Sequence, residues 1–219
     1  MTALLLVVAK APVAGLAKTR LAASVGSRTA ARLAAAALLD TVDSALAVPG
    51  ATVVCALTGD LAAAEHAGEL ADVLRDCVVF AQRGVDFADR LANAHADVAA
   101  CFPGAPVLQV GMDTPQVRAP MLTAALTRLA ETDAVLGPAG DGGWWALGLR
   151  RPADAHVLRG VPMSRPDTGA RTAAALRAIG LRVGRLPVVS DVDTWADAVV
   201  VAEQAPSTRF AREFAVVAR

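Results

Sequence analysis

The sequence has few cysteines, and none of them is placed as a disulfide or metal site would need. Cys55, Cys77 and Cys101 lie far apart and form no Cys-x-x-Cys or Cys/His spacing. An odd number of isolated cysteines indicates neither a disulfide framework nor a zinc site. We therefore predict that all three are buried as small apolar side chains.

Long apolar segments and excess charge are also missing. Although 55% of the 219 residues are hydrophobic, charged residues interrupt every apolar run before the roughly 20 residues that a membrane-spanning helix needs. The formal net charge is zero, which gives no electrostatic reason to expect nucleic acid or an anionic membrane as partner. The first residues lack the basic region of a secretory signal. We expect a cytoplasmic protein without membrane insertion, folded as a single α/β domain over residues 1–219.

Lysine is nearly absent, and its distribution is informative. Of 21 basic residues only two are lysines, Lys10 and Lys18, and both lie in one short segment that also contains Arg20. Pro12 and Gly15 stop helix and strand there, so residues 10–20 are predicted to form a loop after the first strand. Such a loop can hold phosphate, although it matches neither a Walker motif nor Gly-x-Gly-x-x-Gly. The alternative is a solvated basic turn.

Residues 107–115, VLQVGMDTP, contain an acid at the end of an apolar run. The run predicts a buried strand, and the residues after it predict a helix that begins at Pro115 with Thr114 as N-cap. Asp113 would then lie at the C-terminal edge of an open α/β sheet, where ligands bind. We expect its carboxylate to face substrate or metal.

The remaining patterns predict further strands and helices. Strands are expected over residues 3–9, 51–57, 77–81, 134–137, 144–149 and 181–189. Helices are expected over residues 27–48, 60–74, 86–100, 115–131 and 168–179, from Trp195, and in the tail from Ser207. His95 has no second ligand at metal-binding spacing and is not expected to bind a metal.

Two more acids, Asp191 and Asp193, stand two residues apart after the last predicted strand. Alternate side chains of extended backbone point the same way, a geometry that suits a divalent ion. The alternative is N-capping of the helix from Trp195, for which Asp193 or Thr194 would suffice.

Asp141 lies in a glycine-rich segment with Gly140, Gly142 and Gly143. The glycines allow positive φ and close backbone approach, which would leave Asp141 accessible to a ligand. The alternative is that Asp-Gly-Gly only shapes a hairpin turn. Two adjacent tryptophans follow at 144 and 145 and point to opposite faces of a strand, so one can pack in the core and the other can flank a ligand.

With these segments placed, the chain resembles a known bacterial family. The motifs are Lys10-Ala-Pro-x-x-Gly-x-x-Lys18-Thr-Arg-Leu21, Gly111-x-Asp-x-Pro115, Leu136-Gly-Pro-Ala-x-Asp-Gly-Gly143 and Asp191-Val-Asp-Thr-x-x-Asp197. They are similar to those of transferases associated with radical-SAM, selenodomain and arsenosugar clusters. These are GT-A-type nucleotide-diphospho-sugar transferases, related more distantly to phospholactate and molybdenum-cofactor guanylyltransferases. The resemblance implies a three-layer α/β/α fold with a mixed, mostly parallel sheet of about seven strands, one of them antiparallel.

The resemblance also implies roles for the motif residues. Lys10, Lys18 and Arg20 would hold the nucleotide's phosphates, Asp113 would coordinate Mg²⁺ or Mn²⁺, and Asp193 would share the ion. With the ion, Lys18 and Arg20 would stabilise the charge on a diphosphate leaving group, while Asp141 would orient or deprotonate an acceptor hydroxyl. The other motif residues expected at the nucleotide are Pro12, Gly15, Thr19, Gly111, Gly142 and Gly143.

The implied function is metal-dependent transfer of a sugar from a nucleotide-diphospho-sugar to a small acceptor. The alternatives are a nucleotidyltransferase that joins an NTP to a phosphorylated acceptor and releases pyrophosphate, and a nucleotide-binding protein without catalysis. Met112 stands where the family usually has Ser, and Trp144-Trp145 where it has Tyr. Both departures concern the acceptor pocket, so the sequence leaves the acceptor, the base, the sugar and the oligomeric state open.

Overall fold

The structure, a computed structural model, describes residues 3–218. Its strands are β1 (Leu4–Lys10), β2 (Thr52–Thr58), β3 (Val78–Ala81), β4 (Val107–Gly111), β5 (Ala134–Pro138), β6 (Trp144–Leu149) and β7 (Val183–Arg185). They form one seven-stranded sheet in the order β3-β2-β1-β4-β6-β5-β7. β6 runs antiparallel to β4 and β5, and the other neighbouring pairs are parallel. The predicted mixed, mostly parallel sheet is confirmed.

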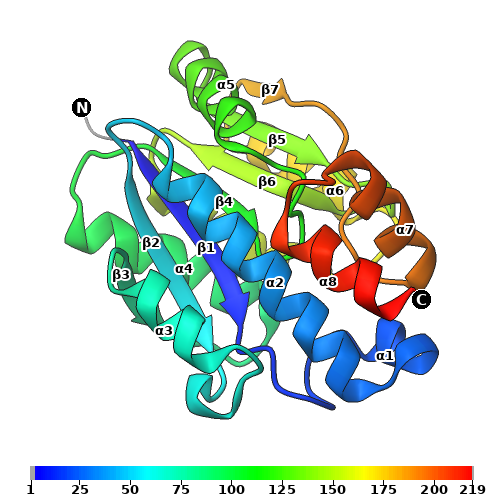
Figure 1. Cartoon of the computed structure of the whole chain (residues 1–219). Coiled ribbons are helices and arrows are strands. Elements are labelled where there is room, and N and C mark those ends of the chain that lie inside the picture. Colours follow the sequence, from blue (N-terminus) through cyan, green and yellow to red (C-terminus); the bar gives the residue numbers. More distant parts are fainter. Residues whose placement is uncertain (1–2, 219) are drawn as a thin grey trace.

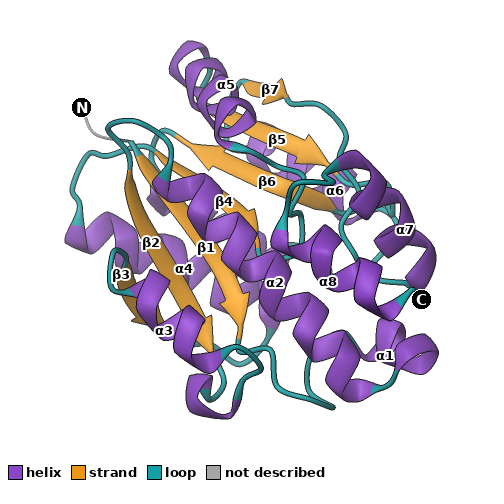
Figure 2. Ribbon diagram, viewed as in Figure 1, coloured by secondary structure: helices purple, strands orange, loops and turns teal. Residues whose placement is uncertain are grey.

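Helices cover both faces of the sheet and complete the three layers (Figures 1 and 2). One face carries α2 (Ser27–Leu46), α3 (Ala67–Leu74) and α5 (Ala119–Glu131). The opposite face carries α4 (Phe87–Cys101), the 3₁₀ segment η2 (Pro152–Gly160) and α6 (Thr168–Ala178). The short helix α1 (Thr19–Val25) and the C-terminal helices α7 (Trp195–Gln204) and α8 (Arg209–Val217) pack against α2 in a third apolar cluster.

β1 is the central strand, and its apolar residues serve both faces. Leu5 and Val7 pack in the core under α2, whereas Leu4, Leu6 and Val8 pack in the core under α4. All of them are buried, so a run without polar alternation is what this position requires. Because β1 and β4 are parallel neighbours, Lys10 at the end of β1 lies at the same edge of the sheet as the C-terminal end of β4.

A buried carboxylate joins α8 to α2. Asp40 on α2 is 3% exposed, and its two oxygens accept hydrogen bonds from the backbone N–H groups of Arg209 (3.0 Å) and Phe210 (2.8 Å). These are the first residues of α8, where unpaired N–H groups and the helix dipole favour a negative charge. Phe210 is fully buried beside Leu33. The C-terminal helix is thus attached by apolar packing and by one fully paired acid.

Three predicted elements have different bounds in the structure. The helix expected from Pro115 begins at Ala119, because a turn closed by the Val117 N–H and the Thr114 carbonyl comes first. The helix expected over 60–74 is divided into η1 (Leu61–Ala63) and α3, since His66 adopts a left-handed conformation with φ 56°. Of the strand expected over 181–189, only the three residues Val183–Arg185 form β7. Further along, Val189 forms an isolated bridge with Ala139.

The prediction that all three cysteines are buried is wrong for two of them. Cys55 lies on the central strand β2 and is buried, but Cys77 is half-buried and Cys101 is exposed. Cys77 immediately precedes the edge strand β3, and Cys101 is the last residue of α4. Both sit at the ends of elements near solvent, which residue type alone does not reveal.

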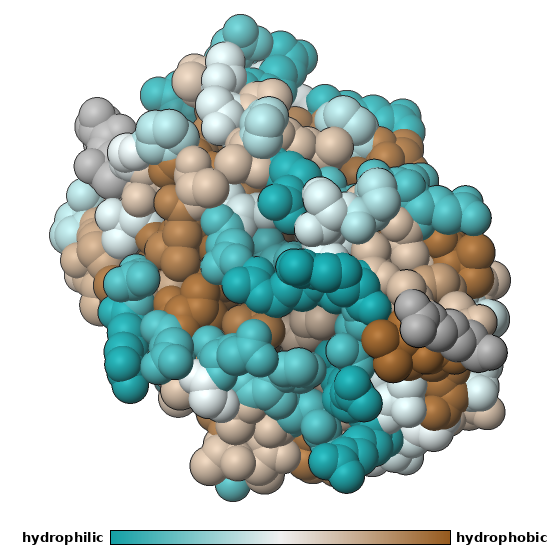
Figure 3. Space-filling view, in the orientation of Figure 1, coloured by the Kyte–Doolittle hydropathy of each residue, from teal (hydrophilic) through white to brown (hydrophobic). Residues whose placement is uncertain are grey.

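The face of the molecule in the orientation of Figure 1 has no single large apolar area. On the side shown in Figure 3, polar residues predominate and apolar residues form several separate patches. Among the helices of residues 3–218, none has both the length and the apolar character that crossing a membrane requires.

Candidate functional site

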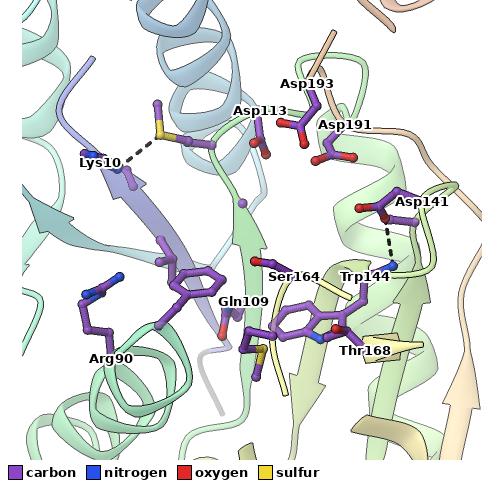
Figure 4. A pocket seen from close by; sticks show the side chains of 18 of the residues that line it. Lys10, Arg90, Gln109, Asp113, Asp141, Trp144, Ser164, Thr168, Asp191 and Asp193 are labelled. Atoms are coloured by element: carbon purple, nitrogen blue, oxygen red, sulfur yellow. Dashed lines mark hydrogen bonds between the residues drawn. The ribbon is translucent and has the colours of Figure 1, made fainter. Parts of the chain in front are cut away.

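A cavity of about 610 Å³ opens at the C-terminal ends of β1 and β4, a size typical of small-molecule sites. Its walls come from these strands, from α4, from the β5–β6 turn, from residues 163–168 and from the segment after β7. Figure 4 shows Asp113, Asp191 and Asp193 close together on one side of the cavity, with Gln109 and Trp144 further from them. This is the edge at which open α/β sheets bind ligands.

The basic loop after β1 is shorter than predicted. Lys10 is the last residue of β1, whereas Thr19 and Arg20 already belong to α1, so the loop spans residues 11–18. Within it Pro12 precedes the turn, and Gly15 has φ 79°. Helix α1 begins at Thr19, and its N-cap, Lys18, has the left-handed backbone conformation.

Lys10 and Arg20 both line the cavity beside Asp113. The Lys10 ammonium is exposed, and its hydrogen bond goes to the carbonyl of Leu16 at 2.7 Å. The Lys10 backbone N–H points to Sδ of Met112 at 3.2 Å, so Met112 contacts the start of this loop. Arg20 donates to Asp193 at 3.0 Å and is largely exposed. Neither cation is committed to a buried partner.

Three carboxylates form the centre of the site. Asp113, Asp191 and Asp193 each offer an oxygen, and these oxygens lie within 4.8 Å of one another. The backbone N–H of Val192, between the last two, donates to the Asp113 carbonyl at 3.0 Å. This bond fixes the segment after β7 against the end of β4. The structure therefore unites Asp113 and Asp193, which the resemblance assigned to the metal, with Asp191, which the spacing had paired with Asp193 but the resemblance had not assigned.

The alternative role of Asp193 as a helix cap does not apply. Helix α7 is capped by Thr194, whose hydroxyl accepts from the Asp197 N–H, while the Asp197 side chain accepts from the Thr194 N–H at 2.7 Å. This reciprocal capping box satisfies the helix end without the Asp193 carboxylate. Both oxygens of Asp193 are instead directed at cations.

Lys18 lies among these acids rather than free in the loop. Its Nζ is 2.6 Å from Oδ2 of Asp113 and 2.8 Å from Oδ1 of Asp193, and its side chain is 11% exposed. Burial by itself would lower the pKa of Lys18, but the two carboxylates outweigh it and raise the pKa above its ordinary value. The ammonium is therefore charged, and it contacts the oxygens that a metal ion would use.

The acids themselves differ in their electrostatic surroundings. Burial and the neighbouring charges of Asp113 and Asp193 raise the pKa of Asp191 to about 6. For Asp193 burial acts in the same direction, but Lys18 and Arg20 outweigh it and lower the pKa. A carboxyl whose pKa is raised by like charges lies where positive charge is insufficient. The cluster can therefore accept a further cation.

Asp141 is partly engaged in the turn that the glycines make. Its Oδ1 accepts from the Gly143 N–H at 2.8 Å, as the turn interpretation predicts, yet Asp141 also lines the cavity (Figure 4). Gly142 has φ 89°, and a Cβ there would lie 1.8 Å from the Pro166 carbonyl oxygen. Gly142 thus allows residues 163–168 to close one wall of the cavity. Of the glycines expected at the nucleotide, Gly111, the last residue of β4, and Gly143 line the cavity, whereas Gly15 and Gly142 are not among its lining residues.

The two tryptophans separate as strand geometry requires. Trp145 is 3% exposed and donates its indole N–H to the Pro187 carbonyl at 2.9 Å, so it is a core residue. Trp144 is half-buried and flanks the cavity. The cavity-lining tryptophan is therefore the first of the pair.

Several cavity residues were not found from the sequence. Gln82 donates from Nε2 to the carbonyls of Ala9 and Ala56, both at 2.8 Å, and so joins the ends of β1 and β2. Arg90 and Gln109 also line the cavity. Gln109 did carry a signal, since it is the polar residue within an otherwise apolar strand. The others did not, because their sequence context is that of ordinary loops and helix surfaces.

Comparison with known proteins finds structures with the same α/β fold. A family model described as "Uncharacterized protein conserved in bacteria (DUF2064)" matches residues 41–165. A crystal structure from Desulfovibrio desulfuricans G20, provisionally described as a nucleotide-diphospho-sugar transferase, is 28% identical with a TM-score of 0.84. The match covers 99% of this chain and 97% of that one. No curated protein matches the sequence.

Two more distant structures share the fold. CMP:2-keto-3-deoxy-manno-octonic acid synthetase in complex with CTP has a TM-score of 0.59 at 12% identity, covering 94% of this chain and 99% of the other. Rv0371c of Mycobacterium tuberculosis H37Rv, in complex with manganese, has a TM-score of 0.54 at 21% identity, covering 92% and 99%. Each chain is matched over almost its whole length, so the likeness extends to the complete fold.

Proposed function

The chain belongs to the DUF2064 family of bacterial proteins, and we propose that it is a metal-dependent transferase that moves a sugar from a nucleotide-diphospho-sugar to a small acceptor. The observation that carries this proposal is the cluster of Asp113, Asp191 and Asp193 beside the cations of the first loop, at the mouth of one cavity. The Desulfovibrio protein, similar over nearly all of its length, supports the same substrate class.

The donor set of the cluster fits a hard divalent ion. Carboxylate oxygens suit Mg²⁺ and Mn²⁺, and three carboxylates lie together here with Lys18 and the exposed Arg20 as the cations that contact them. Asp113, Asp191 and Asp193 would hold the ion. Once bound, the ion would supply positive charge that stabilises the diphosphate leaving group. The manganese complex of Rv0371c, which has the same fold, supports the choice of metal.

The cations of the segment 10–20 would hold the phosphates. Lys10 and Arg20 line the cavity next to Asp113 and remain available to an anionic ligand. Lys18 would turn from the acids to the phosphates when a metal ion takes its place, because an ammonium and a divalent ion would repel each other at the same carboxylates. Fixed cations near the diphosphate stabilise the charge that develops as its bond to the sugar breaks.

Asp141 would orient the acceptor hydroxyl and remove its proton. Its Oδ1 is held by the Gly143 N–H, which fixes the carboxylate, and the residue faces the cavity. Trp144 and residues 163–168 line the same side. This side would therefore hold the acceptor, while the side with Lys10 and Arg20 would hold the nucleotide.

The proposal is tested by ligand-dependent stability and by product analysis. NTPs and nucleotide-diphospho-sugars are added with and without Mn²⁺, and the melting temperature is recorded for the wild type and for Asp113→Asn. A ligand at about a hundred times its Kd adds about 2.7 kcal/mol of stability. We expect a Mn²⁺-dependent shift in the wild type that the variant loses. An equal shift in both proteins would refute the metal assignment.

Product analysis then separates the reaction types. Release of a nucleoside diphosphate from a nucleotide-diphospho-sugar would support the proposal. Release of pyrophosphate from an NTP, without turnover of any nucleotide-diphospho-sugar, would make the protein a nucleotidyltransferase. Binding without either product would indicate a nucleotide-binding protein without catalysis.

A further inference from the structure

His95 and Gln109 form a polar pair beneath the cavity, in an otherwise apolar layer. His95 on α4 is fully buried, and its Nε2 lies 2.8 Å from Oε1 of Gln109 on β4. The other ring nitrogen, Nδ1, is buried and has no partner among residues 3–218. A buried N–H without a partner is rarer than a lone pair without one, so we assign the proton to Nε2, which donates to Gln109.

Gln109 therefore has its carbonyl oxygen engaged and its amide nitrogen left over. The residue is 2% exposed and lines the cavity. In the described part of the chain, the amide nitrogen has no hydrogen-bond partner, and His95 fixes which way the amide is turned. Figure 4 shows Gln109 between Arg90 and Trp144. The Gln109 amide N–H₂ is therefore a hydrogen-bond donor of fixed orientation at the cavity. Burying a polar side chain here costs free energy that an apolar side chain would not cost, which favours a ligand that accepts the hydrogen bond.

Arg90 adds positive charge to the same region. It lies on α4, lines the cavity and has its guanidinium 5.8 Å from the centre of the Phe87 ring. Its Nε is buried without a hydrogen-bond partner, and no acid within residues 3–218 pairs with it. The neighbouring acid, Asp89, pairs with Arg159 instead. Arg90 is half-buried, and a partly desolvated guanidinium without a counter-ion favours a ligand that brings a carboxylate or a phosphate.

We propose that Gln109, positioned by His95, and Arg90 bind a carboxylate or phosphate group of the acceptor substrate, which makes the acceptor an anion. The inference rests on the proposed function, since it names the class of acceptor for that site. Gln109 precedes Asp113 by four residues, and residues advance about 3.3 Å each along a strand. Gln109 therefore contacts a different group from the diphosphate that the acids and the first loop would hold.

Three small probes of equal carbon skeleton test the proposal: glycerol, glycerate and glycerol 3-phosphate. Their affinities are measured by NMR titration of the ¹⁵N-labelled protein, and the side-chain amide signals of Gln109 are identified by their loss in Gln109→Leu. We expect at least one of the two anions to bind about tenfold more tightly than glycerol and to shift these signals. The anion that binds more tightly identifies the group as carboxylate or phosphate.

Variants assign the preference to the named residues. Arg90→Gln and Gln109→Leu should each reduce the preference for the anion by about tenfold, whereas Arg75→Gln, at an exposed position, should leave it unchanged. Equal binding of all three probes, no binding at all, or an unchanged preference in both variants would overturn the proposal. Any of these results would leave Mn²⁺-dependent nucleotide binding intact, whereas loss of that binding in the wild type would remove the proposed function itself.

The positioning role of His95 has its own test. His95→Leu removes the donor to Gln109 and should abolish the preference, while His95→Gln supplies a new side-chain donor and should restore part of it. Thermal melting of both variants, compared at equal buffer and pH, distinguishes unfolding from loss of orientation. A folded His95→Leu protein that keeps the full preference and the wild-type Gln109 amide signals would show that His95 does not position Gln109.

Discussion

Asp40 and the three acids of the cavity are all carboxylates that the fold withdraws at least partly from bulk water. Of these, only Asp40 has both oxygens and its charge satisfied by other groups within the region that the structure describes. Asp40 accepts two backbone hydrogen bonds at the start of α8 and has Arg209 beside it. In the cavity, Asp113 and Asp193 share Lys18, Asp193 also pairs with the exposed Arg20, and Asp191 has no ion-pair partner within residues 3–218. The first arrangement needs nothing more, whereas the second has three negative charges near two positive ones. A carboxylate that the fold itself completes is structural, and an incomplete cluster indicates a ligand.

The largest effect is expected at the incomplete cluster. Asp113→Asn removes a charged oxygen ligand and should reduce Mn²⁺-dependent transfer by about 10³-fold, measured as nucleoside diphosphate released per unit time. Asp72→Asn, at an exposed acid of α3, is the matched control and should retain wild-type activity. If both variants were equally active, the cluster would not be the catalytic metal site.

Substitution of Asp40, whose oxygens are satisfied within the protein, should lower stability and leave ligand binding unchanged. Asp40→Ala leaves the N–H groups of Arg209 and Phe210 without their acceptor, and we expect the free energy of unfolding to fall by about 3 kcal/mol. Urea denaturation measures this loss. Mn²⁺ affinity of the folded variant should match that of the wild type, and a large decrease would contradict the division between the two sets of acids.

His95 extends the comparison to a buried group that is neutral. Burial lowers its pKa to about 4, while in the unfolded chain its pKa is about 6.5. Between these values the unfolded state binds the proton and the folded state does not, so stability is retained above pH 6.5 and lost as the pH falls toward 4. The loss is about 3 kcal/mol. Urea titrations at several pH values should show it relative to His95→Gln, and parallel pH curves for the two proteins would refute it.

Lys18 is the cation that partly completes the cavity acids. Without nucleotide, Lys18→Gln should bind Mn²⁺ about tenfold more tightly, because no ammonium then competes for Asp113 and Asp193. With nucleotide present, the same variant should bind more weakly, since a phosphate contact is lost. Mn²⁺ electron paramagnetic resonance measures both affinities. Lys10→Gln, which removes an exposed cation that contacts no acid within residues 3–218, serves as control for the first effect.

The smallest expected effect is a gain in stability, opposite in sign to the loss expected for Asp40→Ala. Asp191→Asn removes a charge that is disfavoured by burial and by its two acidic neighbours, so the protein without metal should gain about 1 kcal/mol of stability at pH 7.5 after allowance for solvent screening. Its Mn²⁺ affinity should fall. Thermal melting with and without Mn²⁺ measures both changes, and destabilisation in the metal-free state would show that the cluster is already complete.

Local pattern was sufficient for the sheet and for much of the site's composition. The apolar run of β1 predicted a strand covered on both faces, and the buried alternation of Leu5 and Val7 with Leu4 and Leu6 agrees with it. The end of the strand at 107–111 was also predicted correctly, so Asp113 could be placed at the sheet edge. These features depend on periodicity and on chain neighbours, which a sequence displays directly.

The errors arose where a backbone conformation or a distant contact decided the outcome. The left-handed conformation of His66 divides a predicted helix, and residue preference does not indicate it. The sequence suggested that Lys18 would bind phosphate, but it could not place the ammonium between the acids. Gln109 was visible as the polar residue of an apolar strand, but its contact with His95 and the position of Arg90 beside the cavity appear only when α4 lies over β4.

By itself the sequence determined the strand and helix pattern, the sheet edge at Asp113 and the concentration of lysine near residues 10–18, since each depends on residues close together in the chain. Only the tertiary structure decided which charges meet. Lys18 reaches Asp113 across 95 residues and Asp193 across 175. The physical reason is that the energy of a charge depends on its distance from other charges and on its burial, and both are fixed by packing of the whole chain.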